Sequence, residues 1–463
     1  MGRTRQQSCL LALSVLVLLF AAPAAQAAVT PLIDLTRHPV GYLILLIFFT
    51  AYAFVVVEKA IHMRKSKPVM LAAGLIWALL GVVYVVHGES AALETAAKHV
   101  ILDYGELMLF LIVAITYVNT MRERRVFDAL RAMLVGQRLS YRQLFWFVGG
   151  LSFIFGPIID NLTTALVMGA VVIAIGVGNY QFIVMGCIII VIAANAGGVF
   201  SPFGDITSLM VWQKGKLQFL EFFRLFLPSL VNVLVPAVFM HFGVPKGAPE
   251  PVTEDTRLRP GGIIVILLFL ATIATAVIFK SVVGLPPALG MMLGLGYLQM
   301  YAYVLQTIGR RRRDESIGFD SFRAMRHVEW DTLLFFFGII FAVGGLGVAG
   351  YLPLVSAYLY GDLGPTFANI AIGVLGAAFD NIPLMFAVLT MNPEMSSGQW
   401  MLITLSTGVG GSLVSIGSAA GVVLMGLVRN HYTFMNHLRW AWAIALGYVA
   451  SILTHLWVNA AVM

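Results

Sequence analysis

The chain has 463 residues, of which 60% are hydrophobic and only 11% are charged, and its formal net charge is +7. Charged residues make up about 25% of an ordinary soluble globular protein, so the composition excludes that class and indicates a polytopic membrane protein. The basic residues fall in short clusters between apolar runs, which indicates cytoplasmic loops rather than nucleic-acid binding. The sequence has no residue spacing typical of zinc, haem or nucleotide binding, so no cofactor is expected.

Residues 1–27 have the pattern of a cleavable signal peptide. Arg3 and Arg5 precede an apolar core at 10–20, and a small-residue cleavage site follows. Cleavage would leave the mature N-terminus outside the cytoplasm. We expect a multi-pass protein of the bacterial inner membrane, with this N-terminus in the periplasm. An uncleaved first helix is the alternative. Cys9 lies in this leader and Cys187 in an apolar run, so the mature chain has no disulfide pair.

Three apolar runs of the first half are long enough to cross a membrane. They occupy 40–57, 69–86 and 101–118. The loop 88–99 carries Glu89 and Glu94, as expected outside, whereas the arginines of 119–143 place that segment inside. Apolar residues recur at helical spacing over 126–134, which predicts a helix along the membrane surface.

A pair of short apolar runs follows, joined by Asp160-Asn161. They occupy 144–159 and 162–177. We expect a re-entrant hairpin with the Asp-Asn pair at its tip, since irregular backbone at membrane depth needs protein or water around it. Two thin crossings joined by a loop are the alternative. The Asp-Asn pair recurs only as Asp380-Asn381.

A broken helix comes next. Its first part occupies 182–194, the interruption with Pro202 occupies 197–204, and its second part occupies 206–212. Lys214 and Lys216 would then lie outside, against the positive-inside rule. A closing span at 222–242 returns to the cytoplasm, where the proline-rich, charged segment 245–260 links the two halves.

The second half repeats this order of elements. It has spans at 261–279, 287–305 and 333–348, a hairpin at 367–379 and 382–391, a helix at 401–406 and 419–428 broken at 408–417, and a closing span at 440–458. We therefore predict an all-α polytopic membrane protein of two inverted repeats, 28–244 and 261–463. Each repeat has three spans, a re-entrant hairpin, a broken helix and a closing span, an architecture typical of secondary transporters.

Polar residues that carry oxygen gather at the hairpin tips and helix breaks. An Asp in the middle of a membrane helix costs about 2.5 to 3.5 kcal/mol on insertion scales, so such residues usually have a function. Oxygen ligands suit hard cations, and 149–178, 190–212, 373–391 and 402–428 contain no Lys or Arg that would attract an anion. We predict a site for a small cation at Asp160, Asp205 and Asp380.

Carboxylates that are gathered in a low dielectric hold protons more tightly than in water. Protons and a metal cation would then compete for the same oxygens. If the site opens to each side of the membrane in turn, this competition exchanges one ion for the other. Exchange of a small metal cation for H⁺ is thus expected, with no catalytic residue.

Two stretches, residues 156–166 and 193–212, resemble the NhaD family of Na⁺/H⁺ antiporters, and the similarity covers the chain beyond the leader. The paired hairpins resemble, more distantly, a superfamily that includes dicarboxylate and arsenite carriers. The resemblance implies electrogenic exchange of Na⁺ or Li⁺, activation at alkaline pH and a homodimer. Matched by position, it implies a cation and proton path through Asp160, Asn161, Asn195, Asp205, Thr207, Ser208, Asp380, Asn381, Ser415 and Ser418. It also makes Glu106 a candidate for a proton path, with an interfacial carboxylate as the alternative.

Two other functions compete with cation exchange. A dicarboxylate or oxyanion carrier of the same superfamily would need positive charge at its site, which the sequence lacks there. An intramembrane aspartyl protease would need Gly-x-Gly-Asp, whereas this chain has Pro202-Phe203-Gly204-Asp205.

Overall fold

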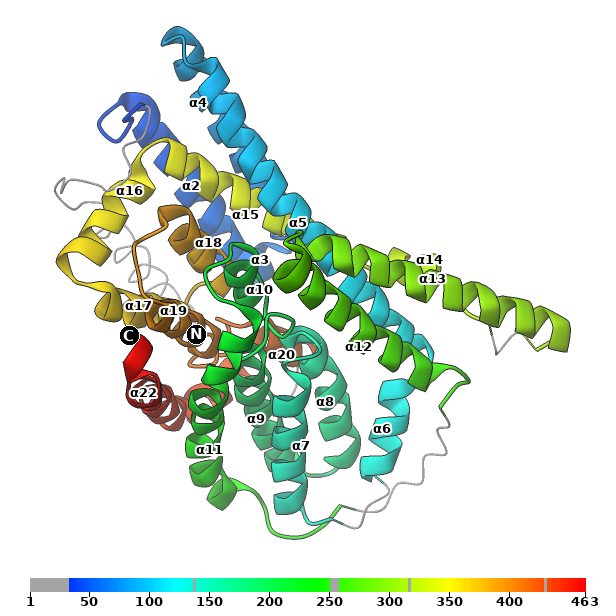
Figure 1. Ribbon diagram of the computed structural model, residues 1–463. Coiled ribbons are helices and arrows are strands. Elements are labelled where there is room, and N and C mark those ends of the chain that lie inside the picture. The colour runs from blue at the N-terminus through cyan, green and yellow to red at the C-terminus, as the bar shows by residue number, and fades with distance from the viewer. Residues whose placement is uncertain (1–32, 136–138, 250–257, 315–317, 429–430) are drawn as a thin grey trace. The chain divides into compact units, whose positions relative to one another are not determined.

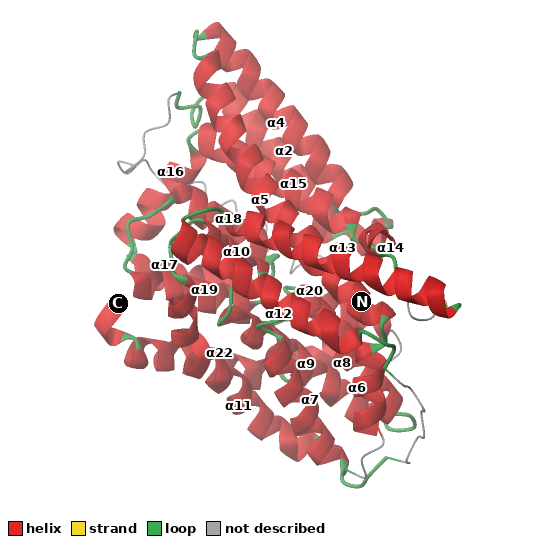
Figure 2. Ribbon diagram, turned by 45° about the vertical axis from the view of Figure 1, so that its right-hand side comes forward, coloured by secondary structure: helices red, strands yellow, loops and turns green. Residues whose placement is uncertain are grey.

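The computed structural model describes residues 33–135, 139–249, 258–314, 318–428 and 431–463. Throughout these ranges the regular structure is helical, with no strand (Figure 1, Figure 2). Nine helices among the described residues are long and apolar enough to cross a membrane. The prediction of an all-α polytopic membrane protein is therefore confirmed. The signal peptide predicted at 1–27 lies outside the described residues, as does the part of the linker at 250–257.

The chain divides into two compact units. Unit 1 comprises the residues up to Gly105 together with Glu329–Ala371 and Ile382–Met395. It contains α2 (Pro39–Val56), α3 (Glu58–Ile61), α4 (Ser66–Val86), α15 (Trp330–Val348), α16 (Tyr351–Ser356) and the π-helix η3 (Ala357–Asp362). Helix α4 packs against α2 and α15, and the indole of Trp77 donates a 2.9 Å hydrogen bond to the Phe341 carbonyl.

Unit 2 comprises Glu106–Val328, Ile372–Asn381 and Ser396–Met463. Its first helices are α6 (Val126–Val135), α7 (Tyr141–Phe155), α8 (Asn161–Ile175), α9 (Tyr180–Val199), α10 (Ile206–Gln213), η1 (Phe219–Leu225) and α11 (Phe226–Gly243). They are followed by α12 (Gly262–Ile278), η2 (Phe279–Val283), α13 (Pro287–Arg312), α14 (Ser321–Arg326), α19 (Ser397–Gly410), α20 (Ala419–Leu427), α21 (Phe434–Leu438), α22 (Ala441–Val458) and η4 (Ala460–Val462). Three helices have residues in both units: α5 (Ser90–Glu123), α17 (Pro365–Leu375) and α18 (Asn381–Met391).

Helix α9 forms the core of unit 2. Its span is entirely buried and apolar all round, as expected of a helix with protein on every side. It packs against α7, α8, α11, α19 and α20, and Figure 1 shows α7, α8 and α9 side by side. The residues at the end of α9 therefore meet both the hairpin and the second broken helix.

The positions of the predicted helices are confirmed, but three predicted boundaries are wrong. The second break begins at Gly411 rather than at 408, because α19 extends to Gly410. Most of the outer loop predicted at 88–99 is the first part of α5, because alanine and glutamate favour a helix and Glu94 pairs with Lys98 at 2.7 Å. Gly197 remains inside α9, so the break begins at Phe200 rather than at 197. The helices α14, α16 and α21 were not predicted, since they are too short to show a periodic apolar pattern.

Candidate functional site

The carboxylate of Asp160 lies where α8 begins. It accepts a 2.9 Å hydrogen bond from the backbone N–H of Thr163 and a 2.7 Å bond from the Thr163 hydroxyl. Asp favours this capping position because its oxygens satisfy N–H groups that have no partner within the helix. The negative charge also faces the positive end of the helix dipole. The Asp-Asn pair thus lies between two short helices, α7 and α8.

Asp205 occupies the same position at the start of α10. It accepts a 3.4 Å bond from the Thr207 N–H and a 2.9 Å bond from the Thr207 hydroxyl, and it is only 8% exposed. The sequence in the break, with Pro202 and Gly204, ends α9 and turns the chain so that α10 starts afresh at this carboxylate. Two aspartates from different elements are therefore held by the same Asp-Thr arrangement.

Asn195 joins three elements of the site. Its Oδ1 accepts a 3.0 Å bond from Asn161 Nδ2 at the hairpin tip and a 3.1 Å bond from Ser418 Oγ in the second break. The residue is fully buried, and its Nδ2 has no hydrogen-bond partner among the described residues. Buried polar atoms are nearly always paired, so this free amide marks a place where another group can bind.

Asp380 and Asn381 bring the second hairpin to the same place. Asp380 lies near enough to Asp205 for the two carboxylates to repel each other. Asn381 is 6% exposed and its Oδ1 has no hydrogen-bond partner among the described residues. A Cβ added to Gly411 would lie 3.0 Å from its Nδ2, so this amide lies directly against the second break.

Backbone contacts between hairpin and break recur in the two halves. A Cβ on Gly204 would clash with the carbonyl oxygen of Gly156, and a Cβ on Gly417 would clash with that of Gly376. Gly417 follows Gly204 by 213 residues, the offset between the pairs Gly197-Gly198 and Gly410-Gly411. Gly376 follows Gly156 by 220 residues, the offset between Asp160 and Asp380. The glycines of this pattern therefore serve close backbone approach, which a side chain would prevent.

The two halves differ at one position that the sequence pattern did not single out. At the offset of 213 the counterpart of Asn195 is Gly408, and that of Asp205 is Ser418. Asn195 bonds Ser418, whereas a Cβ on Gly408 would lie 3.5 Å from Asp205 Oδ2. The second half thus has no amide where the first has Asn195, and the bare backbone of Gly408 faces Asp205 of the first half instead.

Not every predicted site residue joins this cluster. Ser208 donates its hydroxyl to the carbonyl of Val199 at 3.3 Å, and Ser415 donates to the sulfur of Met425 at 3.5 Å. Their hydroxyl hydrogens therefore point to neighbouring helix atoms rather than to the carboxylates. Within the described ranges, no three Asp, Glu, His or Cys side chains come close enough to hold one metal ion together.

Glu106 lies on α5 at the start of unit 2. Four residues further on, the ring of Phe110 packs against Phe203 in the first break, with centroids 5.4 Å apart. Since residues four apart share a helix face, Glu106 lies on the side of α5 that faces this break.

Sequence reasoning missed a buried pair behind the second break. His437 approaches the carbonyl of Ser412 at 2.9 Å through Nε2 and the hydroxyl of Tyr432 at 2.7 Å through Nδ1. An Nε2–H that donates to Ser412 and an Nδ1 that accepts from Tyr432 satisfy the ring as neutral imidazole. These residues follow the last broken helix with no pattern that would have identified them.

Known proteins that are similar to this chain are named as transporters. The family model described as "Citrate transporter" matches residues 52–408. The chain is 53% identical to "Na(+)/H(+) antiporter NhaD" of Alkalimonas amylolytica, over 96% of each chain, and 51% identical to the protein of that name from Vibrio cholerae, over 92% of this chain and 94% of the other. It is also 31% identical to "Sodium/proton antiporter 1" of Arabidopsis thaliana, over 89% of this chain and 72% of that protein.

Proposed function

Since the chain belongs to the NhaD family of Na⁺/H⁺ antiporters, within the broader group described by the citrate-transporter model, we propose that it exchanges Na⁺ for H⁺ by alternating access. The observation that carries the mechanism is the convergence of Asp205 in the first break, Asp380 in the second hairpin and Asn195 at the end of α9. In this proposal the carboxylates bind either a proton or a sodium ion, so that release of one accompanies binding of the other.

The charge of the site supports a cation rather than the anion that the family model's description names. No Lys or Arg occurs in residues 149–178, 190–212, 373–391 or 402–428, which supply the hairpin tips and breaks. Citrate or an oxyanion would face aspartates there without a positive side chain. The dicarboxylate alternative is therefore not favoured.

The ion site is built, in this proposal, from mixed oxygens. Asp205 and Asp380 supply charge, and the unpaired Oδ1 of Asn381 is available as a neutral ligand. Asp160 supplies a carboxylate at the hairpin tip and caps the first turn of α8. Glu106, on the face of α5 toward the first break, is proposed to pass protons to the site.

Further properties rest on the resemblance or on the sequence pattern rather than on the geometry. We propose Li⁺ as a second substrate, a homodimer, and insertion in the bacterial inner membrane with a periplasmic N-terminus after removal of residues 1–27. The cytoplasmic linker is placed at 245–260, between repeats 28–244 and 261–463.

Everted membrane vesicles test the function. With a respiratory proton gradient established, added Na⁺ or Li⁺ should dissipate the gradient through the wild-type protein. Asp160→Asn and Asp380→Asn should abolish the response, whereas Glu94→Gln, which removes an exposed carboxylate that pairs only with Lys98, should leave it intact. Full activity in both aspartate variants would remove these carboxylates from the mechanism.

A further inference from the structure

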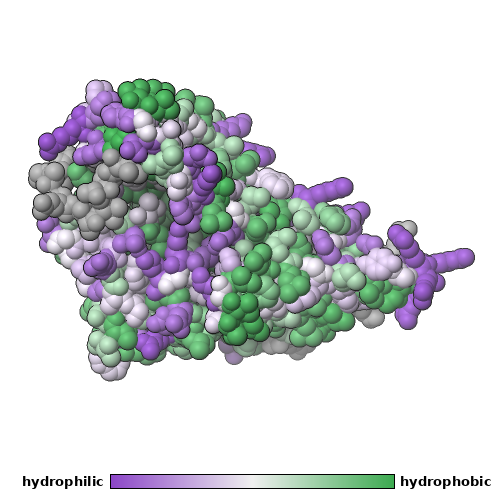
Figure 3. Space-filling view, turned by 45° about the horizontal axis from the view of Figure 1, so that its top comes forward, coloured by the Kyte–Doolittle hydropathy of each residue, from purple (hydrophilic) through white to green (hydrophobic). Residues whose placement is uncertain are grey.

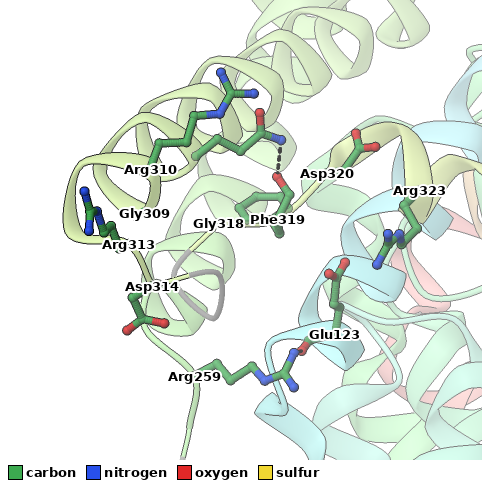
Figure 4. A pocket seen from close by; sticks show the side chains of 11 residues that line it. Glu123, Arg259, Gly309, Arg310, Arg313, Asp314, Gly318, Phe319, Asp320 and Arg323 are labelled. Atoms are coloured by element: carbon green, nitrogen blue, oxygen red, sulfur yellow. Dashed lines mark hydrogen bonds between the residues drawn. The ribbon is translucent and has the colours of Figure 1, made fainter.

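A cavity of about 840 Å³ lies in unit 2, at the ends of α12 and α13 that are away from their connection through η2. It opens where α5 and α13 end and where the chain enters α12, so it lies level with the ends of three span candidates (Figure 4). Four arginines from three segments line it, namely Arg259, Arg310, Arg313 and Arg323. In Figure 4, Arg310 and Arg313 extend from the end of α13, while Arg323 and Arg259 border the opening from the other side.

Three of these guanidinium groups are unpaired among the residues that the structure describes. The side chains of Arg310, Arg313 and Arg323 make no hydrogen bond or ion pair with any residue that the structure describes. Three carboxylates also line the wall: Asp314, Asp320, which accepts the N–H of Phe322 at 3.0 Å, and Glu123, which lies 3.8 Å from the buried Arg124. Four arginines against three carboxylates leave the cavity lining with a net positive charge.

The positive-inside rule and the helix dipole account for arginines at the end of α13. Neither accounts for arginines from three separate segments that line one cavity. Planar guanidinium groups bind phosphate oxygens in bidentate fashion, so the site fits a phosphate group better than a single-atom anion.

The surface leading to the cavity is apolar. On α13 the side chains of Met300, Tyr303 and Val304 are exposed by 66%, 65% and 47%, within three turns of Arg310. In Figure 3 hydrophobic surface covers this helix and gives way to hydrophilic side chains at its tip on the right. A ligand with an acyl chain could lay that chain along α13 while its head enters the cavity, which a soluble phosphate could not do.

We propose that this cavity binds the phosphate headgroup of an anionic membrane lipid, with Arg310, Arg313 and Arg323 as its ligands. Basic pockets between spans on the cytoplasmic side suit such headgroups. The site is separate from the aspartates of the transport path and does not depend on which ion is exchanged.

The test measures lipid binding to the full chain purified in neutral detergent, by native mass spectrometry and by the shift in melting temperature. The probes are phosphatidylglycerol, cardiolipin, phosphatidylcholine and inorganic phosphate. The anionic lipids should bind and raise the melting temperature, and Arg310→Gln/Arg313→Gln should weaken their binding by about tenfold or more. Arg323→Gln, on a different helix, should weaken it as well.

Arg311→Gln/Arg312→Gln is the matched control, since it removes the same charge from the same helix end but from residues that do not line the cavity. It should bind anionic lipid like the wild type. An equal loss of lipid binding in the control would show that diffuse surface charge, rather than this cavity, binds the lipid. An equal effect of inorganic phosphate would mean a soluble anion, and no preference for anionic over zwitterionic lipid would end the proposal. A variant that elutes as aggregate is replaced by Arg323→Gln alone.

Discussion

At the scale of single residues, the site depends on side chains that hold one another while leaving a few atoms unpaired. Asp160 and Asp205 each use a threonine two or three positions later, and each faces a helix N-terminus. The free Nδ2 of Asn195 and the free Oδ1 of Asn381 lie among these satisfied groups. A site arranged in this way is polar enough for an ion and still has atoms available to bind it.

Replacing Asn195 with alanine should damage both stability and transport. It removes the acceptor of the Asn161 amide and the Ser418 hydroxyl, and a buried donor left unsatisfied costs about 1–3 kcal/mol. We expect a lower melting temperature and at least a tenfold rise in the Na⁺ concentration for half-maximal activity. Thr404→Ala is the control, because that buried hydroxyl bonds only the Trp400 carbonyl of its own helix. Similar behaviour of the two variants would show that Asn195 is an ordinary core residue.

His437 predicts a pH dependence of stability. Burial lowers its pKa to about 4, from about 6.5 in an unfolded chain. Between these values the unfolded chain binds a proton that the folded chain does not, so the stability from neutral His437 is complete above pH 6.5 and is lost as the pH falls toward 4. The melting temperature of the wild type should therefore fall more steeply over this range than that of His437→Gln. Parallel curves would contradict a buried neutral imidazole.

Residue types and positions of the transport path were largely predictable, because charge inside an apolar run is conspicuous. Side-chain direction was not. Ser415 and Ser418 both follow the second glycine pair, yet only Ser418 reaches Asn195. The role of Gly408 could not be predicted either, since a missing side chain becomes meaningful only beside its neighbours.

At the scale of elements, glycines set how closely hairpins approach broken helices. The sequence pattern located these glycines but assigned Gly197 to the break, whereas it lies within α9 against the Phe153 carbonyl. Glycine is expected to break a helix through its low propensity, but the packing of α7 on α9 outweighs that preference. The start of α5 was missed for the opposite reason, since polar residues there indicated a loop although their helix propensity is high.

Gly417→Ala should abolish transport. The new methyl group would clash with the carbonyls of Gly376 and Ala377 and push the second hairpin away from the break. Gly150→Ala is the control, because a Cβ there meets nothing within 4 Å and alanine favours the helix by about 0.5–1 kcal/mol. We expect Gly150→Ala to be as active as the wild type in everted vesicles and slightly more stable. An active Gly417→Ala would mean that this contact is not needed.

At the scale of the whole molecule, the order of elements recurs in the two halves, and the glycine contacts recur at the same offsets. The opposite orientation of the halves stays a prediction, which rests on the positions of basic residues. The positive-inside rule gives the orientation of spans but not the arrangement of the two units.

Electrogenic exchange would make the transporter respond to membrane potential. Moving one net charge is coupled to about 2.3 kcal/mol per 100 mV. In proteoliposomes without a pH difference, a potential imposed with valinomycin and K⁺ should drive Na⁺ flux, and reversing the potential should reverse the flux. A flux that is independent of the potential would show electroneutral exchange.

The sharing of oxygens between sodium and protons is tested most directly by the release of protons on binding. Purified protein in weakly buffered detergent at alkaline pH should release protons when NaCl is added, and choline chloride should release none. Asp205→Asn and Asp380→Asn should each reduce or abolish this release. Binding of labelled Na⁺ to the wild type without proton release would contradict a shared site.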